Sequence, residues 1–390
     1  MVLAGPDPHG IGGEARIWKL IIVRVDSDEG LYGLGEAPHI QLSPVGVREA
    51  IAAIRDRVVG RDIRDVKPIV SEILWGARPP HRPSIGLGAV PFGAIVWGLG
   101  GVEMALHDLL GKALGVPIWA LLGGRYRDAA PIYLDWSAPR QLDDLGAWAD
   151  MALDAVARGF RDIKFDIDFA ATDQVTDVWS RNLPIAELER IVARLTAVRE
   201  AVGWDVEISA DCHMQYDAVS AIRLSKELAR LRLKWIEDPT PMTHIEAMIR
   251  VREQSPIPIC VGEFCTAEQF RELIERGACD IVHPDVLFAG GLAETRRIAD
   301  MAEAHGMPTA LHNNSGAVGV VASAHVAVAT RNLIGVEYHF HDAPWIGKIL
   351  DRGRPLFDDG RVVVTDTPGL GGVLDEDICA RHLDAGEVLF

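Results

Sequence analysis

The stretch LKWIEDP, residues 233–239, places an apolar run directly before two acids and a proline. A run of this kind is typical of a short buried strand that ends at its acidic residues. Seven similar runs occur between residues 131 and 340, mostly separated by helical segments: PIYLDW, DIKFDIDF, VEISADCHM, IPICVGEF, DIVHPDV, MPTALHNN and LIGVEYHF. Strands that alternate with helices indicate parallel βα units, and eight such units favour a closed barrel over an open sheet.

Six of these runs end in a polar residue at nearly the same phase of the repeat. The residues are Asp211, Glu237, Glu263, Asp285, His312 and Glu337, and consecutive members lie 22 to 27 residues apart. Such a spacing corresponds to one βα unit, so each residue is expected at the carboxyl end of its strand, where barrel enzymes carry their active sites.

The rest of the chain predicts a smaller α+β unit. WKLIIVRVDS and LYGLGEAP are expected to form an antiparallel hairpin around the turn DEG, followed by helices over residues 45–75 and 92–114. The tail after residue 346 is rich in Gly and Pro and contains a short β segment, so we expect it to return to the first unit.

Composition excludes several classes of protein. The 39 basic and 56 acidic residues give a formal charge of -17, which disfavours nucleic acid and anionic membranes as partners. The five cysteines show no CxxC spacing and are expected to be reduced, structural residues of a cytoplasmic protein, since no secretory signal is visible. The uncharged run over residues 85–102 is interpreted as the start of a buried helix rather than a membrane span.

Three carboxylates, Asp211, Glu237 and Glu263, end successive strands and are expected to converge at the barrel mouth. Unpaired, they would repel one another and raise each other's pKa, and a Mg²⁺ ion would remove that cost while leaving positions for substrate. The alternative for any one of them is an ion pair or a helix cap. Three in phase favour the metal site.

Lys164 and Asp166 lie in the run DIKFDIDF, two residues apart and therefore on one strand face. Beside a metal ion, Lys164 could hold a substrate carboxylate or an enolate oxygen, whereas the alternative is a surface ion pair with Asp162 or Asp166.

Asp285 and His312 end neighbouring strands, and a carboxylate on one ring nitrogen makes the other nitrogen a general base. His213 shares a face with Asp211 and is a candidate proton donor to a leaving group, with a packed neutral histidine as the alternative. Glu337 could hydrogen-bond a substrate oxygen or orient a neighbour.

The whole set resembles the enolase superfamily, and the histidine–aspartate pair places the resemblance in its mandelate racemase subgroup. The resemblance is carried by Lys164, Asp211, Glu237 in IEDP, Glu263 in GE, Asp285, His312 and Glu337. Residues 105–124, ALHDLLGKALGVPIWALLGG, and the tail PGLGGVLDED are similar to segments of the same family, so the resemblance covers nearly the whole chain.

The resemblance implies an α/β fold, a (β/α)7β TIM-like barrel with an α+β capping domain built from both ends of the chain. We therefore expect a capping domain over residues 1–125, a catalytic barrel over 126–345, and a segment over 346–390 that returns to the capping domain. The implied chemistry is abstraction of the proton α to a carboxylate, with Mg²⁺ and Lys164 stabilising the enediolate. Family members are usually assemblies, so a homo-oligomer is expected.

One position departs from the racemases of this subgroup. They carry Lys-x-Lys at the end of the second strand, but here the second position is Asp166, which argues against two-base racemisation. His213 matches the histidine that acts as the acid in galactonate dehydratases of the subgroup. The sequence thus resembles acid-sugar dehydratases, in which His312 would take the α-proton and His213 would protonate the departing 3-hydroxyl.

Two alternatives stay open at this point. One is an epimerase or cycloisomerase of an acid sugar or its lactone, with Asp166 as a second base, and the other is a catalytically silent metal-dependent binding protein. The substrate itself, a small acid sugar, is not specified further. His9, His81 and Arg82, in two loops of the expected capping domain, are candidates for selecting it.

Overall fold

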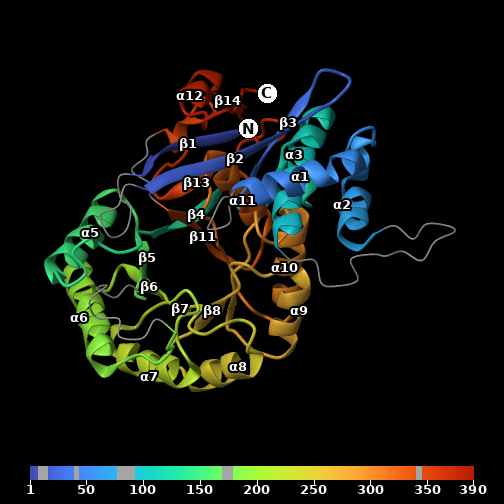
Figure 1. Ribbon diagram of the computed structural model, residues 1–390. Helices are drawn as coiled ribbons and strands as arrows, with labels where there is room; N and C mark the ends of the chain where they lie inside the picture. Colours follow the sequence, from blue (N-terminus) through green and yellow to red (C-terminus); the bar gives the residue numbers. More distant parts are fainter. Residues whose placement is uncertain (8–15, 39–43, 77–92, 169–178, 340–344) are drawn as a thin grey trace.

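The computed structural model of the chain describes residues 1–7, 16–38, 44–76, 93–168, 179–339 and 345–390, and its centre is a closed parallel barrel (Figure 1). Strands β4 to β11 pair in chain order, and β11 pairs with β4 to close the ring. They are β4 (Ala129–Asp135), β5 (Asp162–Asp166), β6 (Glu207–Asp211), β7 (Ile236–Glu237), β8 (Ile259–Val261), β9 (Ile281–Val282), β10 (Thr309–Leu311) and β11 (Leu333–His339). Each of the eight predicted runs overlaps one of these strands, so the predicted barrel is confirmed.

A helix follows each of the first seven barrel strands and covers the outside of the barrel (Figure 1). These helices are α5 (Leu145–Ala157), α6 (Ile185–Val202), α7 (Ala218–Leu228), α8 (Ile245–Gln254), α9 (Ala267–Glu275), α10 (Leu292–Ala304) and α11 (Ala317–Ala329). Local sequence sets several of the starts. Asp144 and Asp217 accept hydrogen bonds from backbone N–H groups in the first turns of α5 and α7.

The N-terminal part forms a three-stranded antiparallel sheet and three main helices beside the barrel (Figure 1). The elements are β1 (Val2–Asp7), β2 (Arg16–Asp26), β3 (Tyr32–Ala37), α1 (Pro44–Val58), α2 (Val66–Trp75) and α3 (Ala94–Leu114), followed by the short helix α4 (Ile118–Leu121). The expected hairpin is confirmed by the antiparallel pairing of β2 with β3.

Helix α3 packs on β3 through glycines. A Cβ atom on Gly33 would lie 2.0 Å from the Ala105 carbonyl oxygen, and one on Gly35 would lie 2.0 Å from that of Gly101. Side chains at these positions would force the helix and the strand apart. The part of the predicted buried helix that the structure describes, α3, is largely buried, and none of the described helices is long and apolar enough to cross a membrane.

The C-terminal segment contacts both the barrel and the N-terminal part. β13 (Arg361–Val363) adds antiparallel to β4, whereas β12 (Leu350–Asp351) pairs with β14 (Val373–Leu374), which precedes α12 (Glu376–Arg381). Leu383 then bridges to Leu3, and the buried carboxylate of Asp108 on α3 accepts hydrogen bonds from the N–H groups of Leu34 and Leu370. These contacts agree with a returning tail, although the domain boundaries themselves stay predictions.

Large side chains fill the barrel beneath its carboxyl end. Tyr133, Trp235, Cys260, Ile281 and Ala310 form one buried cluster, in which the rings of Tyr133 and Trp235 meet edge to face with centroids 5.1 Å apart. The polar groups of both rings bind carboxylates at the mouth of the barrel. The Tyr133 hydroxyl donates to Glu337 Oε2 (2.9 Å), and Trp235 Nε1 donates to Glu237 Oε2 (3.2 Å). The floor of the barrel therefore orients two of the carboxylates above it. All five cysteines are buried and free.

Candidate active site

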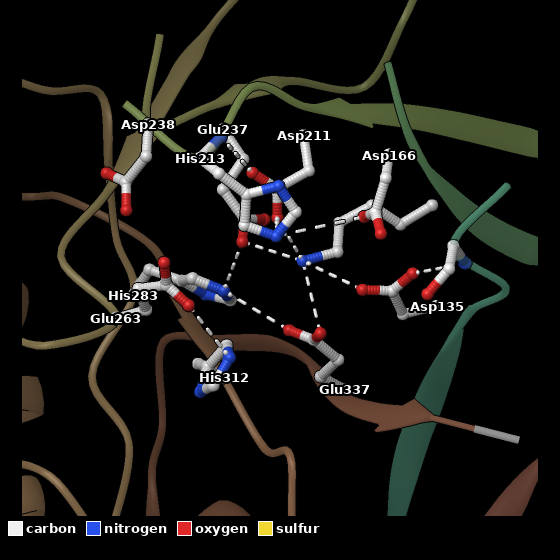
Figure 2. A network of polar contacts seen from close by, with 12 residues as sticks. Asp135, Asp166, Asp211, His213, Glu237, Asp238, Glu263, His283, His312 and Glu337 are labelled. Atoms are coloured by element: carbon white, nitrogen blue, oxygen red, sulfur yellow. Dashed lines mark hydrogen bonds and ion pairs between the residues drawn. The ribbon is translucent and has the colours of Figure 1, made fainter. Parts of the chain in front are cut away.

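Strand register brings the predicted residues together at the carboxyl end of the barrel. Asp166 on β5 pairs laterally with Asp211 on β6, which pairs with Glu237 on β7. Asp285 and His312 face each other in an isolated parallel bridge just beyond β9 and β10. Residues separated by whole βα units thus form one continuous polar surface (Figure 2).

Lys164 is the centre of this surface. Its Nζ lies 2.6 Å from Glu237 Oε1, 2.9 Å from Asp211 Oδ2, 3.1 Å from Glu337 Oε1 and 3.4 Å from Asp135 Oδ2. The lysine side chain is only 1% exposed, so these contacts are shielded from water. The surface ion pair considered from sequence is therefore not what the structure shows.

The environment keeps Lys164 charged. Burial by itself would lower the pKa of Lys164, but the carboxylates of Asp211, Glu237 and Glu337 raise it well above its usual value. The effects on the carboxyl groups differ. Burial and Asp211 raise the pKa of Glu237, whereas His213 and Lys164 lower that of Asp211 against the opposing effect of burial.

His312 and Asp285 form the expected pair. His312 Nδ1 lies 2.5 Å from Asp285 Oδ2, and Asp285 Oδ1 accepts a hydrogen bond from the N–H of Leu287. The other ring nitrogen, Nε2, lies 3.1 Å from Glu263 Oε2. Burial lowers the pKa of His312, but the charge of Glu337 and hydrogen bonds to Asp285 and Glu263 raise it well above its usual value.

His213 forms a second imidazole–carboxylate pair. Its Nδ1 lies 3.1 Å from Asp168 Oδ1, and its Nε2 lies 3.8 Å from Asp211 Oδ2 and 4.0 Å from Asp166 Oδ1. Burial lowers the pKa of His213, but the charges of Asp211 and Asp166 and the hydrogen bond to Asp168 raise it well above its usual value. The backbone of His213 is left-handed, with φ of 41°.

Several residues of the site were not predicted. His283 Nε2 lies 3.1 Å from Glu237 Oε1 and 3.3 Å from Glu337 Oε2, while its Nδ1 contacts the Ala310 carbonyl oxygen. Asp135, Asp168 and His339 also join the network. A signal was available for two of them, since His283 and His339 lie two residues from Asp285 and Glu337 and so share their strand faces.

The predicted metal ligands are divided between two groups of contacts. Asp211 and Glu237 contact Lys164, whereas Glu263 contacts His312. Among the described residues, Glu263 Oε1 and Asp238 Oδ2 are buried oxygens without a hydrogen-bond partner. Buried carboxylate oxygens in excess of donors suit an added hard cation, so the chemistry of this donor set fits Mg²⁺.

Possible metal ligands also form close groups at the carboxyl end of the barrel. In the described part of the chain, three groups have ligand atoms within 4.8 Å of one another: Asp166, Asp211 and His213; Glu237, Cys260 and His283; His312, Glu337 and His339. The metal role of Asp211, Glu237 and Glu263 stays a prediction. The loop candidates His9, His81 and Arg82 lie outside the described residues.

A closed barrel with acids, a lysine and histidines gathered at its carboxyl end defines the class of barrel enzymes that act on small molecules. Comparison with known families is more specific. Residues 147–378 match the family described as Enolase C-terminal domain-like, and residues 13–123 match the Mandelate racemase / muconate lactonizing enzyme N-terminal domain. The chain belongs to this family and is an enzyme of the enolase superfamily.

Two similar proteins have names that belong to one reaction class. The chain is 33% identical over 372 residues to a D-xylonate dehydratase from Haloferax volcanii, covering 95% of this chain and 87% of that protein. It is 30% identical over 371 residues to a D-galactonate dehydratase from Xanthomonas oryzae, covering 93% and 91%. The expected class, a hydro-lyase, is the class to which both names belong.

Solved structures agree with the fold. A mandelate racemase/muconate lactonizing enzyme-like protein from Rubrobacter xylanophilus has a TM-score of 0.86 at 34% identity, covering 99% of this chain and 97% of that one. A racemase from Streptomyces coelicolor with bound magnesium has a TM-score of 0.80 at 25% identity, covering 98% and 97%.

Proposed function

We propose that the protein is a Mg²⁺-dependent acid-sugar dehydratase that removes the proton α to a carboxylate and eliminates the 3-hydroxyl to give a 2-keto-3-deoxy acid. One observation carries the proposal. The histidines of the pairs His312–Asp285 and His213–Asp168 follow strands β10 and β6, the seventh and third of eight, which lie opposite each other across a closed barrel. A substrate between them would meet a base on one side and an acid on the other.

His312 is the proposed base. Asp285 holds Nδ1, which leaves Nε2 as the atom that takes the α-proton. A base must be neutral, and here Nε2 is paired with Glu263. Glu263 is also a proposed metal ligand, and a carboxylate that binds a cation retains an imidazole proton less strongly, so metal binding by Glu263 would lower the pKa of His312 toward that of a base.

His213 is the proposed acid. Its raised pKa means that the ring carries a proton to give, and Asp168 fixes the ring so that Nε2 is the donating atom. Transfer of that proton to the departing hydroxyl releases water rather than hydroxide, which removes the main obstacle to elimination.

Lys164 and a metal ion held by the acids would stabilise the negative charge that develops on the substrate. Removal of an α-proton puts additional negative charge on the substrate carboxylate, and Lys164 at the centre of the mouth supplies a fixed positive charge. Asp211, Glu237 and Glu263 would hold Mg²⁺, which when bound polarises the carboxylate as a Lewis acid. Support comes from the magnesium-bound racemase among the similar structures.

The test separates the two histidines. The protein is assayed with Mg²⁺ against a stereochemical library of aldonic and aldaric acids, following loss of water by mass and uptake of deuterium at the α-carbon. His312→Asn is expected to lose both signals, whereas His213→Asn is expected to keep deuterium uptake and lose dehydration. His305→Asn, at an exposed histidine, is the control. Dehydration that survives in His312→Asn would refute the base assignment.

Asp166 is the residue on which the epimerase or cycloisomerase alternative depends. Its carboxyl is buried at the site, and burial and Asp135 raise its pKa well above the usual value. The charge of His213 opposes this shift, and the position lacks the second lysine that racemases of the subgroup carry, which weighs against two-base chemistry. A product of unchanged mass would nevertheless establish the alternative, and binding without deuterium uptake would indicate a silent binding protein.

A further inference from the structure

Two buried carboxylates of the N-terminal part accept hydrogen bonds from the first turns of two barrel helices. Glu36 lies near the end of β3 and is 1% exposed. Its oxygens accept hydrogen bonds from Gly316 N (2.6 Å) and Gly319 N (3.0 Å). Glu103 on α3 is also 1% exposed and accepts from Leu292 N (2.7 Å) and Ala293 N (3.0 Å). Each carboxylate therefore caps the first turn of a helix that belongs to another part of the chain.

The two helices capped in this way are those that follow the proposed catalytic pair. α10 begins at Leu292, shortly after Asp285, and α11 begins at Ala317, shortly after His312. Their N-cap residues are Gly291 and Gly316, which have no side chain to supply a cap of their own. α5 and α7, by contrast, are capped by aspartates within their own sequence.

Close packing reinforces the connection. A Cβ atom on Gly100 of α3 would lie 2.7 Å from the carbonyl oxygen of Leu287, two residues beyond Asp285. Trp97 of the same helix meets Phe288 edge to face at 5.4 Å between centroids, and the Phe288 ring lies 6.1 Å from that of His312. Helix α3 thus contacts the loop after Asp285 directly, and it reaches His312 through the ring of Phe288.

We infer that Glu36 and Glu103 are positioning residues for the His312–Asp285 pair, an inference that rests on the proposed function of that pair. Each carboxylate fixes where one catalytic loop turns into its helix, and together they set the separation of Asp285 from His312. Charged acceptors suit this task because two N–H groups at a helix start bind a carboxylate more strongly than a neutral oxygen.

Two opposing effects act on the protonation of Glu36. Burial raises the pKa of Glu36 to about 7, while the hydrogen bonds from Gly316 and Gly319 lower it. With or without its proton, the carboxyl retains an oxygen that can accept from at least one N–H group. Glutamine at either position keeps one acceptor and replaces the other by an amide that cannot accept, with almost no change of volume.

The experiment compares Glu36→Gln and Glu103→Gln with Asp108→Asn. Asp108 is a matched control, because it is buried on α3 and accepts from two backbone N–H groups, yet those groups belong to Leu34 and Leu370 and not to the catalytic helices. We expect Glu103→Gln to lower kcat by about 100-fold with KM changed by less than about 3-fold, as for a misplaced catalytic group. Asp108→Asn is expected to lose thermal stability while retaining kcat.

A second readout does not depend on turnover. The short contact between His312 Nδ1 and Asp285 should give a downfield imidazole N–H proton signal, assigned by its loss in His312→Asn. We expect both glutamine variants to shift or broaden this signal, and Asp108→Asn to leave it in place. An unchanged signal and an unchanged kcat in both variants would overturn the inference.

The two readouts keep this inference distinct from the proposed function. If the wild-type protein neither dehydrates nor exchanges any acid sugar, the proposed function fails, but the proton signal still reports whether the two carboxylates set the geometry of the pair. If Glu103→Gln does not fold, Glu36→Gln is judged by the same criteria.

Discussion

Replacement of Lys164 by methionine tests the electrostatics of the barrel mouth without any substrate. The ammonium group contacts carboxylates from four different strands, those of Asp135, Asp211, Glu237 and Glu337, and is 1% exposed. Methionine retains the length and apolar stem but removes the charge. The four carboxylates then remain buried without their shared cation, which is the costly case for a buried ion pair.

The size of the effect follows from that burial. Loss of one partner of a buried ion pair costs about 3–5 kcal/mol in the free energy of unfolding, and no reduction for solvent screening applies here. An unfolding entropy of about 2.1 cal/mol/K per residue over 390 residues converts this loss into a Tm about 4–6 °C lower. The loss should grow as pH rises, because the pKa values of Glu237 and Asp135 are already raised in the fold, and such groups lose stability as they ionise.

The assay is thermal unfolding by circular dichroism in EDTA, at about pH 5 and about pH 8, with Mg²⁺ added in a parallel series. Lys234→Met is the control, because Lys234 forms an ion pair with one carboxylate, Asp162, at the other end of the barrel. Its ammonium also lies over the Trp235 ring, and the side chains of the ion pair are 21% and 18% exposed. That pair is partly exposed and involves one carboxylate instead of four, so its loss is expected to cost less than the loss of Lys164. We expect Mg²⁺ to raise the Tm of Lys164→Met more than that of the wild type. Equal stability of Lys164→Met and wild type at about pH 8 would refute the reasoning.

Three further outcomes are expected. Glu263→Gln should weaken Mg²⁺ binding by at least about 10-fold in calorimetric titration without lowering the metal-free Tm, because one Glu263 oxygen has no hydrogen-bond partner among the described residues; unchanged affinity would remove it from the ligand set. Burial lowers the pKa of His325 to about 4, and since the unfolded residue takes up a proton below about 6.5, stability should fall by about 3 kcal/mol as pH drops through that window; urea unfolding of His325→Gln should lack this fall, and an identical fall would contradict the assignment. Gly369→Ala should destabilise the fold by about 1–3 kcal/mol, because φ is +69° and the new Cβ would lie 2.1 Å from Asp108 Oδ1; a Tm equal to that of wild type would show that the tail relaxes freely.

The sequence predicted the barrel because two regularities coincide in it. Apolar runs recur with one βα unit between them, and the polar residue that ends each run keeps the same phase, so strand number and the active face follow together. The contact of His312 with Asp285 could be expected for the same reason, since neighbouring strand ends are adjacent in any closed barrel.

Other features depend on side-chain choices that no periodicity encodes. Glu263 ends its strand in phase with Asp211 and Glu237, yet its side chain turns to His312 rather than to Lys164. The hydrogen bonds of Glu36 and Glu103 join residues 280 and 189 positions apart in the chain, and neither acid stands at a strand end of the barrel. Only the packing of the N-terminal sheet and helix on the barrel brings them to Gly316 and Leu292.

The glycines between β3 and α3 limit how this protein can be recombined with its relatives. A Cβ on Gly35 would lie 2.0 Å from the backbone of Gly101, and one on Gly100 would press on Leu287 of the barrel, so strand, helix and loop have adapted to one another without side chains between them. Crossover points between residues 38 and 93 would draw the two faces of that seam from different parents. Chimeric proteins made to change substrate preference should therefore take β3, α3 and the loop that contains Leu287 from a single parent.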